Sequence, residues 1–273
     1  SWYEVHLCSE EGTNIIGALF AGSPNVLIGA NQNIAWSHTV NIPDKADVFK
    51  LEMHPNKKKY YKVDETYLKL KTHTAKINVR VLGIPLKIPK KYYESIYGPT
   101  LKNESGYYSI RTPSLFEIKA LEQWWRMNKA KNFTEFYNIL KMKGLPGYNI
   151  GYADKNDTIF YISNGLIPKR TPGHDWANVV SGNTQKTRWT STYDIEELPQ
   201  VIQPKSGYIY NANHSPFRST DSLNNPNQSM FDPAMGFETH DNNRSTRLKQ
   251  LIDAHQTVDY EDFKRIKYDH QYP

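Results

Sequence analysis

The sequence predicts a mixed α+β fold whose strands are largely antiparallel, and three observations support this prediction. Residues 60–88 alternate between polar and apolar side chains with a period of two, as half-buried strands do. Residues 115–140 carry apolar side chains at a spacing of three to four, which is typical of helices packed on one face. Residues 148–161 have the pattern of a hairpin that turns at the polar residues 154–157. Strands and helices mixed in this way are typical of an α+β protein.

Short strands are expected in several parts of the chain. The opening part contains β-rich segments separated by Gly, Asn and Pro-Asp turn signals, and these are residues 26–28, 34–36 and 48–51. Within the alternating stretch, strands are expected at residues 67–71 and 77–81. Pro85 and Pro89 place the end of this stretch at a sheet edge, because proline cannot donate to a ladder. One further strand is expected at residues 207–212.

Helices are expected in three places. The first spans residues 115–127 behind the cap Ser114, and its inward face consists of Ile118, Leu121 and Trp125. The second follows Asn132, which forms a capping-box pattern with Glu135. Its apolar face consists of Phe133, Phe136, Tyr137 and Leu140. The third spans residues 244–254, and its inward face consists of Leu248, Leu251 and Ile252.

The composition excludes several classes of protein. A chain of 273 residues can bury its core as one large domain or as two small ones. Its hydrophobic content of 38%, with 13% aromatic residues, excludes an intrinsically disordered protein. No apolar run approaches the roughly 18 residues that a membrane span needs. The single cysteine, Cys8, excludes an internal disulfide.

The net charge of +6 raises the question of nucleic-acid binding. Lysines cluster at residues 57–59 and 90–91, beside tyrosines. These runs are short, they flank expected strands, and no nucleic-acid recognition motif accompanies them. The solvated rim of a hairpin explains the runs, so a nucleic-acid partner is not expected.

No common single-motif catalytic site occurs in the chain. The GxSxG elbow, the HExxH zinc motif and the P-loop are all absent. The nine histidines are scattered without the spacing of metal ligands. Hydrolysis of an amide would need a nucleophile, a base and donors for the oxyanion, and no single motif supplies them here.

Several longer blocks occur in an informative order. They are WYEVHL at residues 2–7, GANQNIAWS at 29–37, DKADVF at 44–49, GYNIGYAD at 147–154 and QPKSGYIYNANHSP at 203–216. In this order and spacing they resemble the penicillin acylase (penicillin amidase) family of N-terminal-nucleophile hydrolases. The resemblance implies the αββα sandwich of those hydrolases, built from largely antiparallel sheets with flanking helices. This chain would supply part of the sheets and the outer helices.

The resemblance also implies that the chain is an internal segment of a catalytic β subunit. In the family the catalytic chain begins with a serine, and the block similar to WYEVHL lies a couple of dozen residues later. Here Ser1 directly precedes Trp2, so Ser1 is not expected to be the nucleophile. A C-terminal portion is expected to be missing as well, which makes residues 1–273 a single partial domain. The expected macromolecular partner is an α subunit or the remainder of the same precursor.

The activity implied for the parent protein is hydrolysis of an acyl amide, such as a penicillin or an N-acyl homoserine lactone. The substrate would be a small-molecule acyl amide, no organic cofactor is expected, and the isolated chain is expected to be inactive. The alternative is a non-catalytic binding or scaffold domain on the same fold. The resemblance also implies a periplasmic or secreted protein, and no membrane span is expected.

Three residues are assigned to catalysis by the resemblance. Asn213 matches the asparagine whose side-chain amide helps to form the oxyanion hole, because an amide NH2 donates without bringing a net charge. The backbone N–H of Val40 matches the second donor, and Arg244 matches the arginine that orients the site. The alternative for Asn213 is a turn residue after a strand, which is the role expected for Asn211. Arg244 could instead form an ordinary ion pair with Asp241 or Asp253, and Arg247 is expected at the surface.

The resemblance also assigns residues to an acyl pocket. Leu27, Ile28 and His38 match the acyl pocket, although Leu27 and Ile28 could equally be ordinary core. An aliphatic Ile28, where an aromatic residue would suit a ring-bearing acyl group, favours a linear acyl chain.

Asp44, Asp47 and the carbonyl of Ala46 match ligands of a structural calcium, which prefers several oxygens from a flexible loop. Further ligands would come from residues 167–168, from Asp221 or from a separate chain. A solvated turn or a helix-capping pair is the alternative for the two aspartates.

Overall fold

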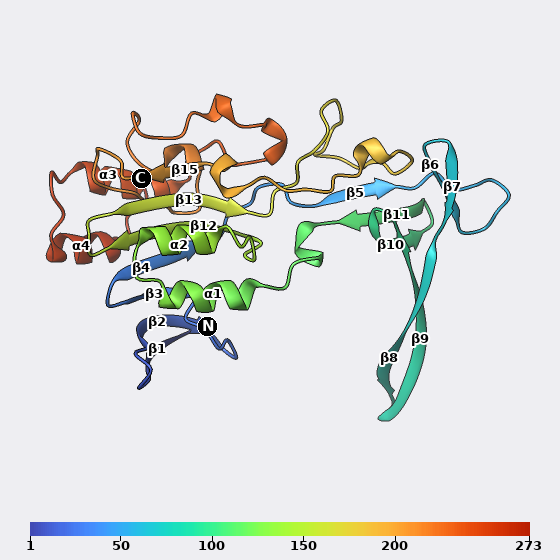
Figure 1. The fold of residues 1–273 in the computed structure, drawn as a ribbon, viewed down its shortest axis with the longest axis horizontal. Helices are drawn as coiled ribbons and strands as arrows, with labels where there is room; N and C mark the ends of the chain where they lie inside the picture. Colours follow the sequence, from blue (N-terminus) through green and yellow to red (C-terminus); the bar gives the residue numbers. More distant parts are fainter. The chain divides into compact units, whose positions relative to one another are not determined.

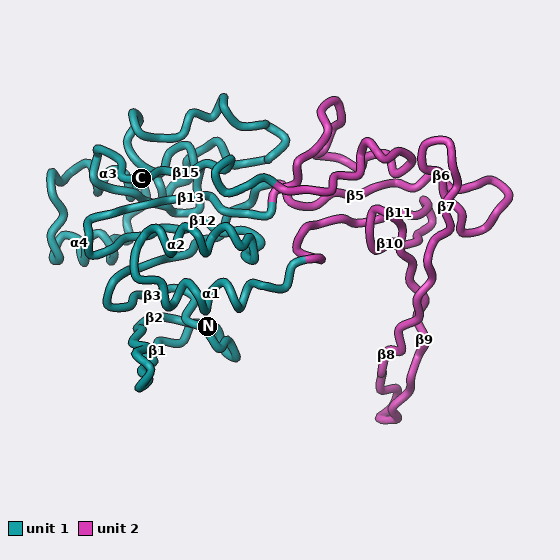
Figure 2. Tube along the Cα trace, viewed as in Figure 1, with its two compact units in different colours: residues 1–43, 117–166, 193–273 teal, residues 44–116, 167–192 magenta.

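The computed structural model describes residues 1–273, and they divide into two compact units (Figures 1 and 2). Unit 1 consists of Ser1–Pro43, Glu117–Leu166 and Tyr193–Pro273, and unit 2 consists of Asp44–Phe116 and Ile167–Thr192. No helix has the length and apolar character that crossing a bilayer requires. The expectation of one partial domain stays a prediction.

A seven-stranded antiparallel sheet forms the centre of unit 1 (Figure 1). In spatial order its strands are β1 (Trp2–Cys8), β2 (Asn14–Phe20), β3 (Ile28–Asn31), β4 (Ile34–Thr39), β12 (Gly147–Asp154), β13 (Ile159–Gly165) and β15 (Gln200–Ile202). Strand β4 confirms the short strand expected at residues 34–36, whereas the strand expected at residues 26–28 is misplaced, because β3 begins only at Ile28. The predicted hairpin is also confirmed, because β12 pairs with β13 and the Asp154 N–H donates to the Thr158 carbonyl across the turn (3.0 Å).

Helix α2 (Phe133–Leu140) packs on one face of this sheet and confirms the predicted helix. The Asn132 side chain accepts a hydrogen bond from the Glu135 N–H (2.9 Å), as the capping pattern predicts. Aromatic rings then join the helix to two strands. Phe136 lies 4.7 Å from the Tyr152 ring of β12, and Phe133 lies 5.2 Å from the Phe160 ring of β13 (centroid distances).

Helix α1 (Ala120–Lys129) forms, but its predicted start and its predicted inward face are both wrong. A short 3₁₀ turn, Pro113–Leu115, precedes it instead of a continuous helix. The expected inward face is exposed, with Ile118 at 93%, and the buried face carries Gln123 and Asn128. These two side chains satisfy backbone groups elsewhere in unit 1. The Asn128 amide bonds both the N–H (3.1 Å) and the carbonyl (2.7 Å) of Val26.

Two further helices, α3 (Asn243–Asp253) and α4 (Tyr260–Lys267), lie against the other face of the sheet (Figure 1). Because Tyr152 and Phe160 face α2, their strand neighbours Gly151 and Tyr161 face the opposite way. These neighbours line a cavity of about 690 Å³ together with apolar side chains of the two helices, namely Leu248, Ile252, Phe263 and Ile266. The third predicted helix is therefore confirmed, while α4 was not expected.

The predicted strand at residues 207–212 is wrong, because this segment is irregular. Its backbone bonds to a loop instead of to a strand: the Tyr210 N–H donates to the Ser219 carbonyl (2.9 Å), and Thr220 Oγ1 donates to the Tyr208 carbonyl (2.8 Å). The loops of unit 1 that precede and follow it contain short 3₁₀ turns, which are Ile195–Glu197, Pro216–Arg218, Gln228–Met230 and Pro233–Met235.

Unit 2 contains a six-stranded sheet and a small hairpin (Figure 2). The sheet order is β14 (Val180–Ser181), β5 (Asp47–Lys50), β11 (Gly106–Arg111), β10 (Gly98–Asn103), β9 (Ile84–Ser95) and β8 (Lys71–Val81), and the hairpin is β6 (Tyr60–Val63) with β7 (Thr66–Lys69). Only the β14–β5 pair is parallel. Stacked rings of Phe49 and Tyr97, 4.7 Å apart, form the centre of its core.

The alternating stretch forms the β8–β9 ribbon, which pairs residue by residue from Lys71–Glu94 to Val81–Ile84. The strand expected at residues 77–81 forms as part of β8, but the half-burial that the sequence predicts for this stretch is wrong. Most ribbon residues are exposed, because β9 meets β10 only at residues 93–95 and nothing in unit 2 covers either face beyond that point.

Candidate active site

Asn213 lies in a loop of unit 1 with its backbone in the left-handed region, at φ 58°. Asparagine tolerates this region because its short polar side chain can bond locally. The Asn213 N–H donates to Asn211 Oδ1 (2.9 Å), and the Asn213 carbonyl accepts from Asn242 Nδ2 (3.0 Å). Two neighbouring asparagines thus hold this backbone conformation.

Arg244 orients the side-chain amide of Asn213. Arg244 Nη2 donates to Asn213 Oδ1 at 2.8 Å. Because a guanidinium has donors only, the atom that faces it is the amide oxygen. The amide nitrogen therefore faces away from Arg244, and it donates to the Val40 carbonyl at 2.7 Å. Asn213 Nδ2 has a second N–H, which is left for another acceptor.

Val40 directly follows β4 and is 63% exposed. Its carbonyl accepts from two amides, Asn213 Nδ2 (2.7 Å) and Asn149 Nδ2 (3.2 Å). Its own N–H has no acceptor within the chain. A fixed backbone N–H beside a fixed amide NH2 is the arrangement of an oxyanion hole.

Asn211 crosslinks the sheet to the loop. Its Oδ1 accepts from Thr39 Oγ1 (2.5 Å), and its Nδ2 lies 3.3 Å from the Tyr161 hydroxyl, to which it donates. The hydroxyl in turn donates to Asn149 Oδ1 (2.8 Å), and burial raises the pKa of Tyr161, so this donor keeps its proton. Sequence reasoning missed Asn149, Tyr161 and Thr39. The available signal was a polar residue, Asn149, between apolar neighbours in an expected core strand.

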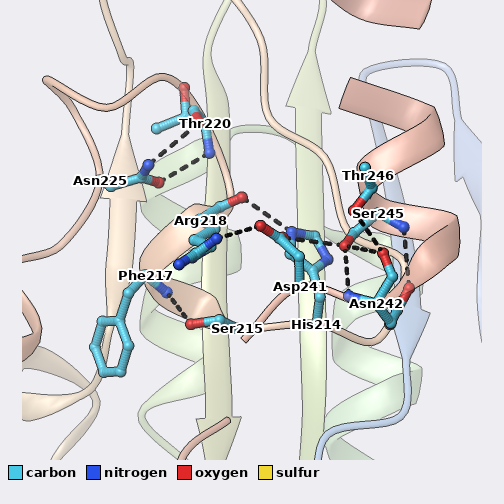
Figure 3. A network of polar contacts seen from close by, with 10 residues as sticks. All are labelled: His214, Ser215, Phe217, Arg218, Thr220, Asn225, Asp241, Asn242, Ser245 and Thr246. Carbon is cyan, nitrogen blue, oxygen red and sulfur yellow. Dashed lines mark hydrogen bonds and ion pairs between the residues drawn. The ribbon is translucent and has the colours of Figure 1, made fainter. Parts of the chain in front are cut away.

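Figure 3 shows the polar network that holds the loop beyond the candidate oxyanion hole. His214 Nε2 donates to the Arg218 carbonyl (2.9 Å), and the Arg218 guanidinium forms an ion pair with Asp241. Ser245 Oγ donates to Asp241 Oδ1 (3.0 Å) and accepts from the Asn242 N–H (2.9 Å) at the start of α3. Burial lowers the pKa of His214, which keeps its ring neutral.

The charged neighbours of Arg244 pair elsewhere, so the alternative of an ordinary ion pair does not describe it. These pairs are Asp241 with Arg218, Asp253 with Lys249, and Arg247 with Asp269. The geometry therefore leaves Arg244 in contact with the Asn213 amide, one residue after α3 begins.

The three candidate pocket residues do not share one face of the sheet. Gly29 of β3 pairs with Trp36 of β4, so His38 lies on the Trp36 face and Ile28 on the opposite one. Leu27 is buried, and its carbonyl accepts from Trp36 Nε1 (2.9 Å). Because β3 begins near where the antiparallel β4 ends, all three residues nevertheless lie toward the same end of these two strands.

His38 is held in one neutral form. Trp124 Nε1 donates to His38 Nε2 at 3.0 Å, and an indole nitrogen cannot accept, so the imidazole proton lies on Nδ1. That Nδ1 is buried and has no partner in the chain. The Tyr148 ring packs 5.2 Å away, and burial lowers the pKa of His38 to about 3. The ring is therefore uncharged at neutral pH.

Asp44 and Asp47 converge on one arginine of unit 2. Arg170 Nη2 lies 2.9 Å from Asp44 Oδ1, and Arg170 Nε lies 3.0 Å from Asp47 Oδ2. Trp189 Nε1 donates to the same Asp47 oxygen (2.6 Å). Burial raises the pKa of Asp47, whereas the bonds from Arg170 and Trp189 act in the opposite direction.

The residues of this chain do not by themselves complete a calcium site. Calcium takes six to eight oxygens, and no group of three or more acidic, histidine or cysteine side chains gathers to hold a metal. The single positive charge of Arg170 is already shared between the two aspartates. Asp47 Oδ1, which is buried without a donor, is open to a further cation. Asp221 instead closes a turn in unit 1, where it accepts from Asn224 Nδ2 (2.6 Å).

Ser1 lies far from the candidate oxyanion hole. It precedes β1, which is the edge strand, and three strand spacings separate β1 from β4. This separation is about 14 Å at the usual spacing of strands. A nucleophile must reach within roughly 3–3.5 Å of the carbonyl that the oxyanion donors hold. Ser1 is therefore not placed to attack it.

Comparison with known proteins decides the family. A family model described as penicillin amidase matches residues 1–273. The chain belongs to the penicillin amidase family. Its penicillin amidase relatives include a penicillin G acylase of Escherichia coli, which is 29% identical over 206 residues, covering 75% of this chain and 24% of that protein. An acyl-homoserine lactone acylase PvdQ of Pseudomonas syringae pv. syringae is 27% identical over 176 residues, covering 61% of this chain and 23% of that protein.

The penicillin amidase fold is also found in the solved structures. A thermostable penicillin G acylase from Alcaligenes faecalis superposes with a TM-score of 0.79 at 20% sequence identity, covering 97% of this chain and 46% of that one. This likeness confirms the predicted α+β fold of the penicillin acylases. The chain spans about a quarter of the length of the curated penicillin amidase relatives it matches.

Replacing Arg170 should strongly destabilise the protein. Arg170→Met leaves two facing carboxylates without a cation, one of them buried, and removing one partner of a buried ion pair typically costs about 3–5 kcal/mol. Urea unfolding of the purified variant measures this loss. Arg126→Met, which removes an exposed pair with Glu122, should cost no more than about 0.5 kcal/mol. Equal losses in the two variants would contradict the role of Arg170.

His38 should make stability depend on pH below about 6.5. Its folded pKa of about 3 lies below its ordinary value of 6.5, so only the unfolded state takes up the proton between these values. The free energy of unfolding should therefore fall as the pH drops below 6.5, by at most about 1.4 kcal/mol per pH unit, and His38 should contribute no slope above 6.5. Urea unfolding of wild type and His38→Gln at pH 7.5, 6.5 and 5.5 isolates this contribution, and parallel pH profiles would refute it.

Proposed function

We propose that the protein carrying this chain hydrolyses an acyl amide, and that residues 1–273 supply its oxyanion hole. The observation that carries the proposal is the orientation of the Asn213 amide. Arg244 takes the amide oxygen, so the nitrogen faces Val40. When a nucleophile attacks an amide carbonyl, negative charge develops on the carbonyl oxygen. The second N–H of Asn213 Nδ2 and the N–H of Val40 would donate to that oxygen.

Both proposed donors are neutral, and their positions are set before any reaction. The network of Thr39, Asn149, Tyr161 and Asn211 fixes the end of β4, and the α3 cap fixes the loop that carries Asn213. Donors that need no reorganisation stabilise the transition state more than the ground state. Arg244 acts as a positioning residue in this proposal, because it contacts the amide of Asn213 and not the reacting carbonyl.

The proposed nucleophile lies outside residues 1–273, in an α subunit or in the remainder of the same precursor. The distance of Ser1 from Val40 supports this view, and the isolated chain is therefore proposed to be inactive. The names of the relatives, penicillin G acylase and acyl-homoserine lactone acylase, support an acyl amide as the substrate class. The aliphatic Ile28, on β3 next to the last residues of β4, favours a linear acyl chain. Export to the periplasm or beyond is part of the proposal, and cell fractionation tests it.

Asn213→Ala in the full-length protein should lower kcat about 100- to 1000-fold, the usual effect of losing one oxyanion donor. Asn213→Asp should lower kcat at least as much, because it keeps the oxygen that Arg244 holds and replaces the donor with a second oxygen. Turnover of a long-chain acyl homoserine lactone and of a chromogenic phenylacetyl amide measures both effects. Circular dichroism and chain maturation should remain those of wild type.

Two controls make this experiment specific. Asn211→Ala removes a crosslink and should lower the thermal midpoint more than it lowers kcat. Equal, small effects on kcat at positions 211 and 213 would return Asn213 to the role of a turn residue. Residues 1–273 alone should show no turnover, and an activity that Ser1→Ala abolishes would place the nucleophile at Ser1. A full-length protein that lacks any amidase activity would favour a scaffold on the same fold.

A structural calcium at Asp44, Ala46 and Asp47 stays a proposal that needs oxygen ligands from outside this chain. Calcium added to the chelator-treated full-length protein should then raise the thermal midpoint by the linkage RT ln(1 + [L]/Kd). Asp47→Asn should abolish the shift. No shift up to millimolar calcium would leave Arg170 as the cation that serves these two aspartates.

A further inference from the structure

One face of the β8–β9 ribbon is apolar over its whole outer half. Cross-strand pairing puts Ile77 opposite Ile88, Val79 opposite Leu86, and Val81 opposite Ile84, so all six side chains point to the same face. Five of them are 46–62% exposed, which for aliphatic side chains in a regular pair of strands is a large uncovered area. Leu82, in the turn at the tip, is 97% exposed.

The opposite face of the ribbon is polar and cationic. It carries Lys76, Asn78, Arg80, Lys87 and Lys91. No aspartate or glutamate occurs between residues 66 and 93, while seven lysines and arginines do. A ribbon with one aliphatic and one cationic face has the pattern of a sheet with one side in water and the other packed on a core. Within unit 2, that second layer is missing.

The outer edge of β9 does not suit a partner that adds a strand. The two-residue turn Leu82–Gly83 has positive φ at both positions (50° and 84°), as hairpin turns that match strand twist require. In such a hairpin the alternate positions that include Pro85 and Pro89 direct their backbone nitrogens outward, and proline has no N–H to offer. The outer edge of β9 is therefore short of donors, whereas the apolar face is open over the whole outer half of the ribbon.

We propose that this apolar face is an interface covered by further polypeptide of the same protein, from outside residues 1–273. The proposal does not depend on the catalytic assignment. The occupant would present an aliphatic strip bordered by carboxylates, because the rim of the ribbon is cationic. A second copy of the chain is disfavoured, since it would bring seven further cations to the same place.

Two observations favour a polypeptide of the same protein over a lipid surface. The chain spans about a quarter of the curated relatives, and 46% of a solved relative of the same fold, so those proteins have ample chain to supply a layer. Unit 1 independently leaves further apolar side chains open. They are Leu121 and Trp125 of α1, at 52% and 41% exposure, and Ile118 in the segment just before the helix, at 93%. Two uncovered faces on separate units are expected where further layers of one protein pack on both.

Thiol labelling of the full-length protein tests the proposal. Single cysteines at Leu86 and Ile84 on the apolar face are compared with cysteines at Lys87 and Asn78 on the cationic face, in a Cys8→Ser background. Peptide mapping reads out the rate of maleimide addition at each site. Labelling on the apolar face should be at least about tenfold slower than on the cationic face, because a covered thiol reacts only when the interface opens locally. In urea the rates should become equal.

Equal native rates on the two faces would overturn the proposal. Protection that disappears on dilution would assign the face to a second copy, and protection that appears only with phosphatidylserine vesicles would assign it to a membrane. Both outcomes contradict the proposal, as does a full-length protein that contains no chain beyond these residues. Where a cysteine variant fails to fold, a benzophenone amino acid at Leu82 replaces it. Its crosslink should map to a peptide outside residues 1–273, and a crosslink only within those residues or to a second copy counts against the proposal.

Discussion

The hydrogen bond from Arg244 to Asn213 is the contact on which the candidate site depends, because the two ends of an amide have the same shape and opposite hydrogen-bonding character. A flipped amide would point its oxygen at the place where an oxyanion develops. Arg244 prevents the flip, and its own position depends on the start of α3. There the Asn242 side chain caps the helix through Ser245 N–H (3.0 Å) and bonds the carbonyls of Ala212 (2.9 Å) and Asn213 (3.0 Å). Helix start, loop backbone and the Asn213 side-chain amide therefore form one connected unit.

Unit 1 holds several backbone groups with neutral side-chain amides. The Asn128 amide bonds the N–H and the carbonyl of Val26, and Asn149 Nδ2 donates to the Val40 carbonyl. Asn41 Nδ2 donates to the Asn164 carbonyl (2.8 Å). An amide satisfies donors and acceptors without the desolvation cost of a buried ion. Unit 2 instead contains a buried ion pair between Asp47 and Arg170. Loss of either partner would leave an uncompensated buried charge. In the proposed oxyanion hole, the Asn213 amide likewise brings no net charge of its own.

The sequence predicts those parts of the fold that local interactions determine. Helix α2 has its cap, its spacing and its apolar face within one stretch of chain, and β12–β13 has its turn residues between two strands, so both were found. Helix α1 was placed with the wrong face inward, because its buried Gln123 and Asn128 satisfy backbone groups that are distant in sequence. The segment at 207–212 has strand composition, but its bonds go to a loop that no local pattern reveals. At the site, the resemblance pointed to Asn213, Val40 and Arg244, while the supporting Asn149, Tyr161 and Thr39 could be recognised only once three separate segments were brought together.

The two wrong burial predictions have the same physical origin. Leu121 and Trp125 do lie on one stripe of α1, with Ile118 in the irregular segment just before the helix, and the aliphatic residues of β8 and β9 do share one face. Periodicity identifies a face that needs cover, whereas burial also requires an element that supplies the cover. The chain covers the aromatic stripe of α2 with β12 and β13, and it supplies nothing for the other two faces. An apolar stripe in a sequence is therefore evidence for an interface in every case, and for a core only where the partner lies within the same chain.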